Sequence, residues 1–95
     1  MTGPADKAAL IRHALRGVID PEIGRSVVDV GLIYGIHVET DGKAVIEMTT
    51  TTRGCPATRY LMDAVRERAL DTAIAGDIEV RLTYDPPWSP DMMAD

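Results

Sequence analysis

Apolar residues recur along the chain at two different spacings, and these spacings predict its elements. Between Lys7 and Val18 the spacing is that of a helix, which Gly17 or the Asp20-Pro21 step is expected to end. A second helical pattern begins after Cys55 and runs out near Gly76. The apolar face of this second helix is predicted to consist of Ala57, Leu61, Ala64, Val65 and Ala69.

Three segments alternate apolar and polar residues, which is the two-residue period of a strand: residues 32–40, 44–50 and 78–84. Asp41-Gly42, between the first two, is a strong signal for a hairpin turn. A crossover through the later helix favours a parallel third strand. The predicted fold class is therefore α/β, a two-layer α+β arrangement in the order α-β-β-α-β with helices packed on a small mixed sheet. One face of the first strand should carry Leu32, Tyr34, Ile36 and Val38.

The length of 95 residues and the 45% hydrophobic content suit one domain over residues 1–95. We expect the core within about residues 7–85, followed by a Pro-rich C-terminal segment over 85–95. No apolar run reaches the roughly 18 residues that cross a bilayer, and the first residues lack the apolar centre of a signal peptide. One cysteine cannot form an intrachain disulfide framework, so we expect a cytoplasmic protein without membrane attachment.

The charge of the chain argues against nucleic acid as a partner. Fifteen acidic residues against ten basic ones give a formal net charge of −5, whereas a phosphate backbone requires a basic surface. The aromatic content of 4%, with no Phe, leaves few side chains on which single-stranded bases could stack.

Cys55, the single cysteine, lies between a predicted strand and a predicted helix and is followed by Pro56. Because Pro suits the first helical position, we expect Cys55 to cap the helix, where unpaired amides favour a thiolate. The helix end alone should lower the pKa of the thiol only slightly, and Arg53 and Arg59 could add to it. The alternative is that Cys55 is a small buried hydrophobic residue.

Two neighbouring motifs could supply polar groups to this thiol. Four threonines, residues 49–52, end the second strand, and hydroxyls on one face of it should point toward Cys55. Asp20-Pro21-Glu22 presents two carboxylates on a rigid turn, where they could accept a proton or bind a metal. The structural interpretations are that Thr favours strands and that Asp20 caps a turn.

The C-terminal segment holds three prolines and the only tryptophan of the chain, Trp88. Together with Met92 and Met93, this side chain could cover a site or form a partner surface. The alternative is that Trp88 covers the end of the core.

The sequence offers no support for an enzyme. His13 and His37 are expected on the surface, and no His-x-x-His or Cys-x-x-Cys pair predicts a closed zinc site. A Cys-dependent hydrolase needs a base with an oriented partner, which no spacing here indicates. Leu61 stands where a tyrosine phosphatase would require arginine.

Four motifs in this order resemble the SufT and PaaD family of small iron–sulfur cluster assembly factors, once known only as a domain of unknown function. The resemblance spans about Ile19 to Met93. No cysteine-bearing C-terminal extension follows, so the chain is nearer to the short SufT-like members. The four motifs are Asp20-Pro21-Glu22-Ile23, residues 26–34, Thr51-Thr52-Arg53-Gly54-Cys55-Pro56, and residues 85–93.

The resemblance implies an α/β fold and a role in maturing iron–sulfur proteins beside scaffold or carrier proteins and client apo-proteins, without catalytic turnover. It also implies which residues form the site. These functional-site candidates are Asp20, Glu22, Thr51, Thr52 and Cys55.

Counting ligands limits what the chain can hold. Iron–sulfur clusters usually take four thiolate ligands, and this chain supplies one. We therefore expect no stably bound cofactor, and Cys55 as a transient ligand for a cluster in transit or as a docking thiol. An exposed strand edge would permit a homodimer, which brings two thiols together. The alternatives are a monothiol redox protein of the glutaredoxin kind and an adaptor with an inert cysteine.

Overall fold

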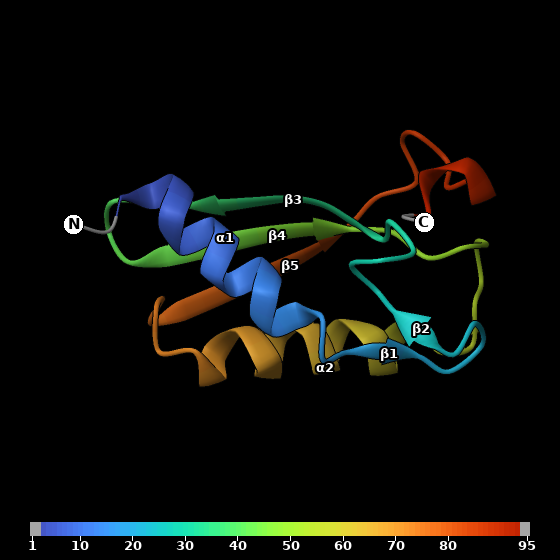
Figure 1. The fold of residues 1–95 in the computed structure, drawn as a ribbon, viewed down its shortest axis with the longest axis horizontal. Coiled ribbons are helices and arrows are strands. Elements are labelled where there is room, and N and C mark those ends of the chain that lie inside the picture. Colours follow the sequence, from blue (N-terminus) through green and yellow to red (C-terminus); the bar gives the residue numbers. More distant parts are fainter. Residues whose placement is uncertain (1–2, 94–95) are drawn as a thin grey trace.

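The computed structural model of the chain, which describes residues 3–93, contains the three-stranded mixed sheet that the sequence predicts (Figure 1). Strands β3 (Ile33–Val38) and β4 (Lys43–Met48) are antiparallel, whereas β5 (Asp77–Leu82) runs parallel to β4, which lies in the middle. At the hairpin, the Glu39 amide donates to the Lys43 carbonyl at 2.8 Å, and Gly42 has a φ of +91°. The predicted fold class and the hairpin are confirmed.

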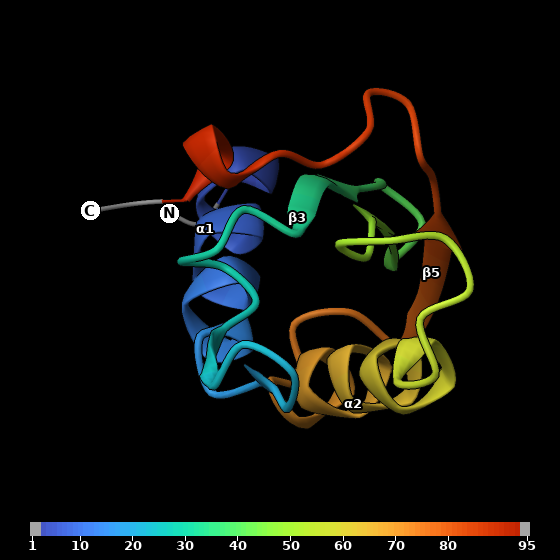
Figure 2. The same cartoon turned by 90° about the vertical axis from the view of Figure 1, so that its right-hand side faces the viewer.

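Two helices, α1 (Pro4–Leu15) and α2 (Thr58–Asp71), lie on the same side of this sheet. Viewed along the strands, α1 is nearer to β3 and α2 is nearer to β5, and the opposite face of the sheet is left uncovered by helices (Figure 2). Within the described residues 3–93, no helix has the length and apolar character needed to cross a membrane. Among the largest fully buried side chains, the helices contribute Ile11, Leu15, Leu61 and Val65, and β4 contributes Ile46 and Met48.

Helix α1 ends at Leu15, three residues earlier than Val18, and the side chain of Arg68 explains the early end. The Arg68 Nε atom donates to the Ala14 carbonyl at 3.1 Å, which satisfies an acceptor at the helix end. A β-carbon on Gly17 would lie 2.3 Å from Arg68 Nη2, so a larger residue there would displace the Arg68 guanidinium from this position. Val18 is buried although it has left the helix.

Helix α2 ends at Asp71, before the predicted end near Gly76. The Thr72 hydroxyl donates to the Ala69 carbonyl at 2.7 Å and so satisfies an acceptor of the last turn. Ala73 then adopts a φ of +58°, a conformation that cannot continue a right-handed helix. The chain therefore turns back to β5 earlier than the apolar pattern indicates.

Two small features were not predicted. Strands β1 (Ile19–Asp20) and β2 (Arg25–Ser26) form a separate antiparallel ribbon. In β3 the register shifts between Ile33 and Gly35, so that Tyr34 is the extra residue of a bulge. The expected face of Leu32, Tyr34, Ile36 and Val38 is interrupted at this bulge, where Ile33 takes the buried place opposite Met48.

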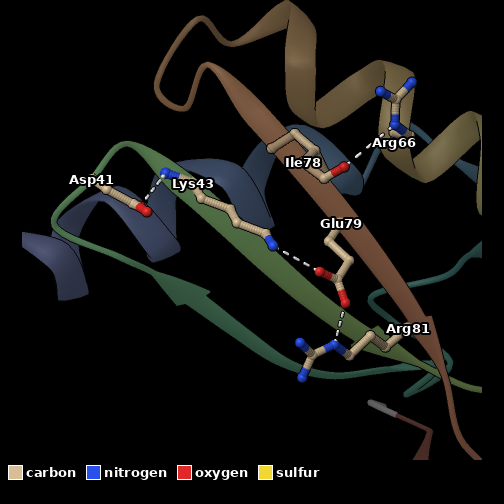
Figure 3. A network of polar contacts seen from close by, with 6 residues as sticks. All are labelled: Asp41, Lys43, Arg66, Ile78, Glu79 and Arg81. Atoms are coloured by element: carbon tan, nitrogen blue, oxygen red, sulfur yellow. Dashed lines mark hydrogen bonds and ion pairs between the residues drawn. The ribbon is translucent and has the colours of Figure 1, made fainter.

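Charged side chains of β4 and β5 form a network on the sheet (Figure 3). Lys43 Nζ lies 2.8 Å from Glu79 Oε1, and the Arg81 guanidinium donates to the other oxygen of the same carboxylate. Hydrogen bonds from Arg81 and then Lys43 lower the pKa of Glu79 to about 2. Separately, Arg66 Nε on α2 donates to the Ile78 carbonyl of β5 at 3.3 Å and so connects the helix to the strand.

The C-terminal segment, residues 85–93, runs from the end of β5 past β3 toward α1 and ends in a short 3-10 helix, Pro90–Met92 (Figure 2). The Trp88 indole donates to the Val30 carbonyl at 2.7 Å, and the Tyr34 hydroxyl donates to the Pro86 carbonyl at 2.8 Å. Gly31, with a φ of +81°, lies directly beneath this segment. The segment is thus fixed to the fold at several points.

We expect Gly31→Ala to destabilise the protein more than Gly42→Ala. Both glycines have a positive φ, so each alanine suffers the left-handed strain of roughly 1–2 kcal/mol. At Gly31 a β-carbon would also lie 2.6 Å from the Met92 carbonyl oxygen, whereas at Gly42 nothing lies within 4 Å. Overpacking should lower the free energy of unfolding of Gly31→Ala by about a further 1–3 kcal/mol. Urea unfolding measures both variants, and equal losses would contradict the packing of the C-terminal segment on Gly31.

Candidate functional site

The thiol of Cys55 meets the carboxylate of Glu22, although the two residues are 33 positions apart. The Cys55 Sγ atom donates to Glu22 Oε1 at 3.3 Å. Cys55 is only 6% exposed, whereas Glu22 belongs to an exposed turn. The thiol therefore lies just inside the surface, with a carboxylate between it and solvent.

The turn that carries Glu22, residues 20–25, is built on a buried aspartate. Asp20 is 2% exposed, and its Oδ1 atom accepts a hydrogen bond from the Glu22 amide at 2.8 Å. The Asp20 carbonyl accepts from the amide of Gly24, which has a φ of +76°, at 2.7 Å. Since the Asp20 carboxylate accepts the Glu22 amide, this residue caps the turn in which Glu22 contacts the thiol.

Cys55 does not cap helix α2, and this part of the sequence prediction is wrong. The helix begins at Thr58, with Ala57 at its cap, because Thr58 closes a separate turn before it. The Thr58 amide and hydroxyl both donate to the Cys55 carbonyl, at 3.1 and 2.7 Å. Pro56 therefore lies in this turn and not at the first helical position.

The direction of the predicted pKa shift is wrong as well. Burial is the largest effect and raises the pKa of the Cys55 thiol, and the neighbouring Glu22 carboxylate raises it further. A hydrogen bond from the Ala57 amide acts in the opposite direction but is outweighed. The structure thus favours the neutral thiol.

The two arginines expected near the thiol have other partners. The Arg53 guanidinium carbon lies 4.8 Å from the centre of the Tyr84 ring, a cation–π arrangement. Arg59 Nε lies 4.0 Å from the Asp63 carboxylate, one turn further along α2. Both guanidinium groups thus have partners other than Cys55.

The threonines divide into two pairs. Thr49 and Thr50 are buried, and the Thr50 hydroxyl donates to the Thr52 carbonyl at 2.7 Å. Thr51 is half-buried and Thr52 is exposed, and within residues 3–93 their hydroxyls have no hydrogen-bond partner. The predicted site residues Thr51 and Thr52 are close to Cys55 in sequence, but the hydroxyl that bonds within the loop is that of Thr50.

Sequence reasoning did not select Thr50 or Tyr84 as site residues. The two hydroxyl oxygens lie 2.7 Å apart, where β4 and β5 end. A signal was present, since parallel neighbouring strands end at the same edge of a sheet and both residues follow apolar runs.

The three partner-surface candidates pack against the chain itself. Trp88 is half-buried against the core, as the alternative interpretation expected. The Met92 sulfur lies 3.6 Å from the Tyr34 hydroxyl oxygen, and the Met93 sulfur accepts from Arg25 Nη1 at 3.7 Å. A role of these side chains in binding a partner stays a prediction.

The donor set near Cys55 is small. Within residues 3–93, no group of three or more His, Cys, Asp or Glu side chains is placed to hold a metal ion. His13 and His37 are both exposed, and His37 lies 3.7 Å from Glu47 on the sheet. Cys55 and Glu22 offer one sulfur and one carboxylate, so any metal bound there must take its other ligands from elsewhere.

Comparison with known proteins places the chain in a family. Residues 8–82 match the family described as "Iron-sulfur cluster assembly protein". The chain is 38% identical over 84 residues to the Fe-S protein maturation auxiliary factor YitW of Bacillus subtilis, covering 88% of this chain and 82% of the relative. It is 38% identical over 77 residues to the auxiliary factor SufT of Staphylococcus aureus, covering 81% and 88%.

A crystal structure of a domain of unknown function from Bacillus anthracis superposes with a TM-score of 0.91 and 32% identity. The match covers 96% of this chain and 87% of that one, so the fold and the sequence lead to the same assignment. The chain therefore belongs to the iron–sulfur cluster assembly protein family, as its four motifs indicated.

Proposed function

We propose that this chain is an accessory factor in the maturation of iron–sulfur proteins, in which Cys55 is a transient ligand for a cluster in transit or a docking thiol. Family membership supports the process, since YitW and SufT are both named Fe-S protein maturation auxiliary factors. The observation that carries the role of Cys55 is its 3.3 Å contact with Glu22, which two separate loops create.

The cluster is cargo in this proposal and not a resident cofactor. A cluster usually takes four thiolates, whereas the chain contributes one thiol and one adjacent carboxylate. Partner proteins must therefore supply the remaining ligands throughout a transfer. The expected partners are a scaffold or carrier that gives up the cluster and a client apo-protein that accepts it, and the factor itself needs no catalytic turnover.

Glu22 gives the thiol a route to the ligating form. Iron binds thiolate and not thiol, so binding must release a proton. When iron approaches Cys55, the S–H bond breaks, an S–Fe bond forms, and the proton passes to Glu22 Oε1. Because Glu22 is exposed, its carboxyl group can return that proton to water. Between transfers, the buried neutral thiol resists oxidation.

The same geometry disfavours one alternative and is compatible with the other. A glutaredoxin-like exchange depends on thiolate at the surface, and the buried thiol with its raised pKa disfavours it. An adaptor with an inert cysteine is the second candidate, because the 6% exposure of Cys55 would suit it equally.

We expect Cys55→Ala to abolish support of client maturation while the protein remains folded. The substitution removes the only sulfur ligand of the chain and leaves the Asp20 turn intact. The measurement is the activity per enzyme molecule of an iron–sulfur enzyme. It is made in cells that lack the gene for this protein and in cells that carry the Cys55→Ala variant in its place. Asp63→Ala, on the exposed side of α2, is the matched control and should retain full support.

The activity of the iron–sulfur enzyme under these conditions distinguishes the candidates. Loss in both the deletion and Cys55→Ala supports the thiol role. Loss in the deletion alone assigns the adaptor role, and no loss in either rejects a maturation function.

We expect Glu22→Gln to lower the pKa of the Cys55 thiol. The amide still offers an oxygen to the thiol but removes the negative charge that opposes ionisation. The rate of iodoacetamide labelling should therefore rise at pH 8, and its midpoint should move to lower pH. Glu67→Gln, an exposed carboxylate on α2, should leave the profile unchanged. An unchanged or higher midpoint in Glu22→Gln would show that the two side chains are not in contact.

A further inference from the structure

Tyr84 follows β5 and touches the loop that precedes Cys55, although 34 residues separate it from Thr50. The hydroxyl oxygens of Tyr84 and Thr50 lie 2.7 Å apart. Thr50 is 1% exposed and Tyr84 is half-buried, so the contact is partly withdrawn from solvent. The contact joins the end of β5 to the start of the loop over residues 50–55.

The direction of these hydrogen bonds follows from counting protons. A threonine hydroxyl has one hydrogen, and Thr50 uses it to donate to the Thr52 carbonyl at 2.7 Å. Thr50 Oγ1 can then only accept from Tyr84, whose phenol donates. The result is a directed chain from the Tyr84 hydroxyl through Thr50 to the main chain at Thr52.

The ring of Tyr84 makes a second contact with the same loop. The Arg53 guanidinium carbon lies 4.8 Å from the ring centre, which is within the range of a cation–π interaction. Tyr84 thus holds the loop through its hydroxyl and through its ring. Beyond these contacts, the loop is fixed on the far side of Cys55 by Thr58, which donates twice to the Cys55 carbonyl.

We infer that Tyr84 is a positioning residue that holds residues 50–55 in the conformation in which Cys55 Sγ faces Glu22. The inference rests on the proposed function of Cys55 and adds a residue to its site. Tyr84 acts on the thiol through its contacts with Thr50 and Arg53. When this hold is removed, the loop opens more often, and the thiol becomes accessible and leaves Glu22.

Tyr34 offers a matched comparison. Its hydroxyl donates to the Pro86 carbonyl at 2.8 Å and has a further hydrogen-bond contact with Thr49, so it holds the C-terminal segment to the end of β4. Tyr34→Phe and Tyr84→Phe therefore each remove one phenol hydroxyl of similar burial. Of the two hydroxyls, that of Tyr84 is the one bonded to the Thr50 side chain, which in turn bonds to Thr52 inside the loop.

The test is the rate of iodoacetamide labelling of Cys55 in the folded full-length chain, as a function of pH. Tyr84→Phe should label about five-fold faster than wild type, since one neutral hydrogen bond contributes on the order of 1 kcal/mol. Thr50→Val, which removes both hydrogen bonds of that hydroxyl, should label at least as fast as Tyr84→Phe. The labelling midpoint should also move to lower pH, because burial and Glu22 both raise the pKa of the thiol. Tyr34→Phe should match wild type, and Thr50→Ser, which keeps the hydroxyl, should too.

Other results overturn the inference. A wild-type rate in Tyr84→Phe would show that the hydroxyl does not hold the loop. Equal acceleration in Tyr84→Phe and Tyr34→Phe would show general loosening instead of positioning. If Tyr84→Phe does not fold, the comparison of Thr50→Val with Thr50→Ser decides the question. Labelling is independent of client maturation, so the proposed function can fail in Cys55→Ala cells while this result still decides the role of Tyr84.

Discussion

The parallel pairing of β4 and β5 is the constraint on which the site depends. Because both strands run in one direction, their carboxyl ends meet at one edge of the sheet, with Met48 opposite Leu82. The Thr83 amide donates to the Met48 carbonyl at 2.8 Å and extends the pairing, so that Thr50 and Tyr84 meet just beyond it. The crossover to α2 also starts at this edge. A slip by one residue would separate the hydroxyl pair and turn the loop that carries Cys55.

Burial is the largest of the effects on the pKa of the Cys55 thiol, and it determines the protonation state of that group. Proximity to a helix end contributes only about 0.3–1 kcal/mol at an exposed position, whereas removing a charged group from water costs more than a single amide hydrogen bond returns. Cys55 also stands three residues before α2, outside its first turn. Glu22 adds a negative charge on the same side. A neutral thiol at rest is therefore the physical outcome, and ionisation requires something that changes its surroundings.

Element types were predictable because they depend on long, periodic patterns, and the details that failed depend on one or two residues. A two-residue strand such as Ile19–Asp20 has no period to detect, so the ribbon that brings Glu22 to Cys55 could not be derived from spacing. The bulge at Tyr34 needs knowledge of the facing strand. Pro56 suits a helix start and a turn equally, and the Thr58 hydroxyl decides between them. The pair of Thr50 and Tyr84, by contrast, was open to sequence reasoning through the parallel register.

A single thiol is better suited to transfer than to storage. If a protein provides all four thiolates of a cluster, every one of them must be exchanged before the cluster is released. Such tight binding slows delivery of the cluster to a client. In the proposed function, a chain that provides one thiolate would release the cluster once the other ligands belong to a client, and the freed thiolate would take up a proton again by way of Glu22. The raised pKa of Cys55 acts in the same direction, because the proton competes with iron for the sulfur. Under this proposal, weak ligation and a buried resting thiol are two results of one arrangement, and the partner's ligands would determine where the cluster stays.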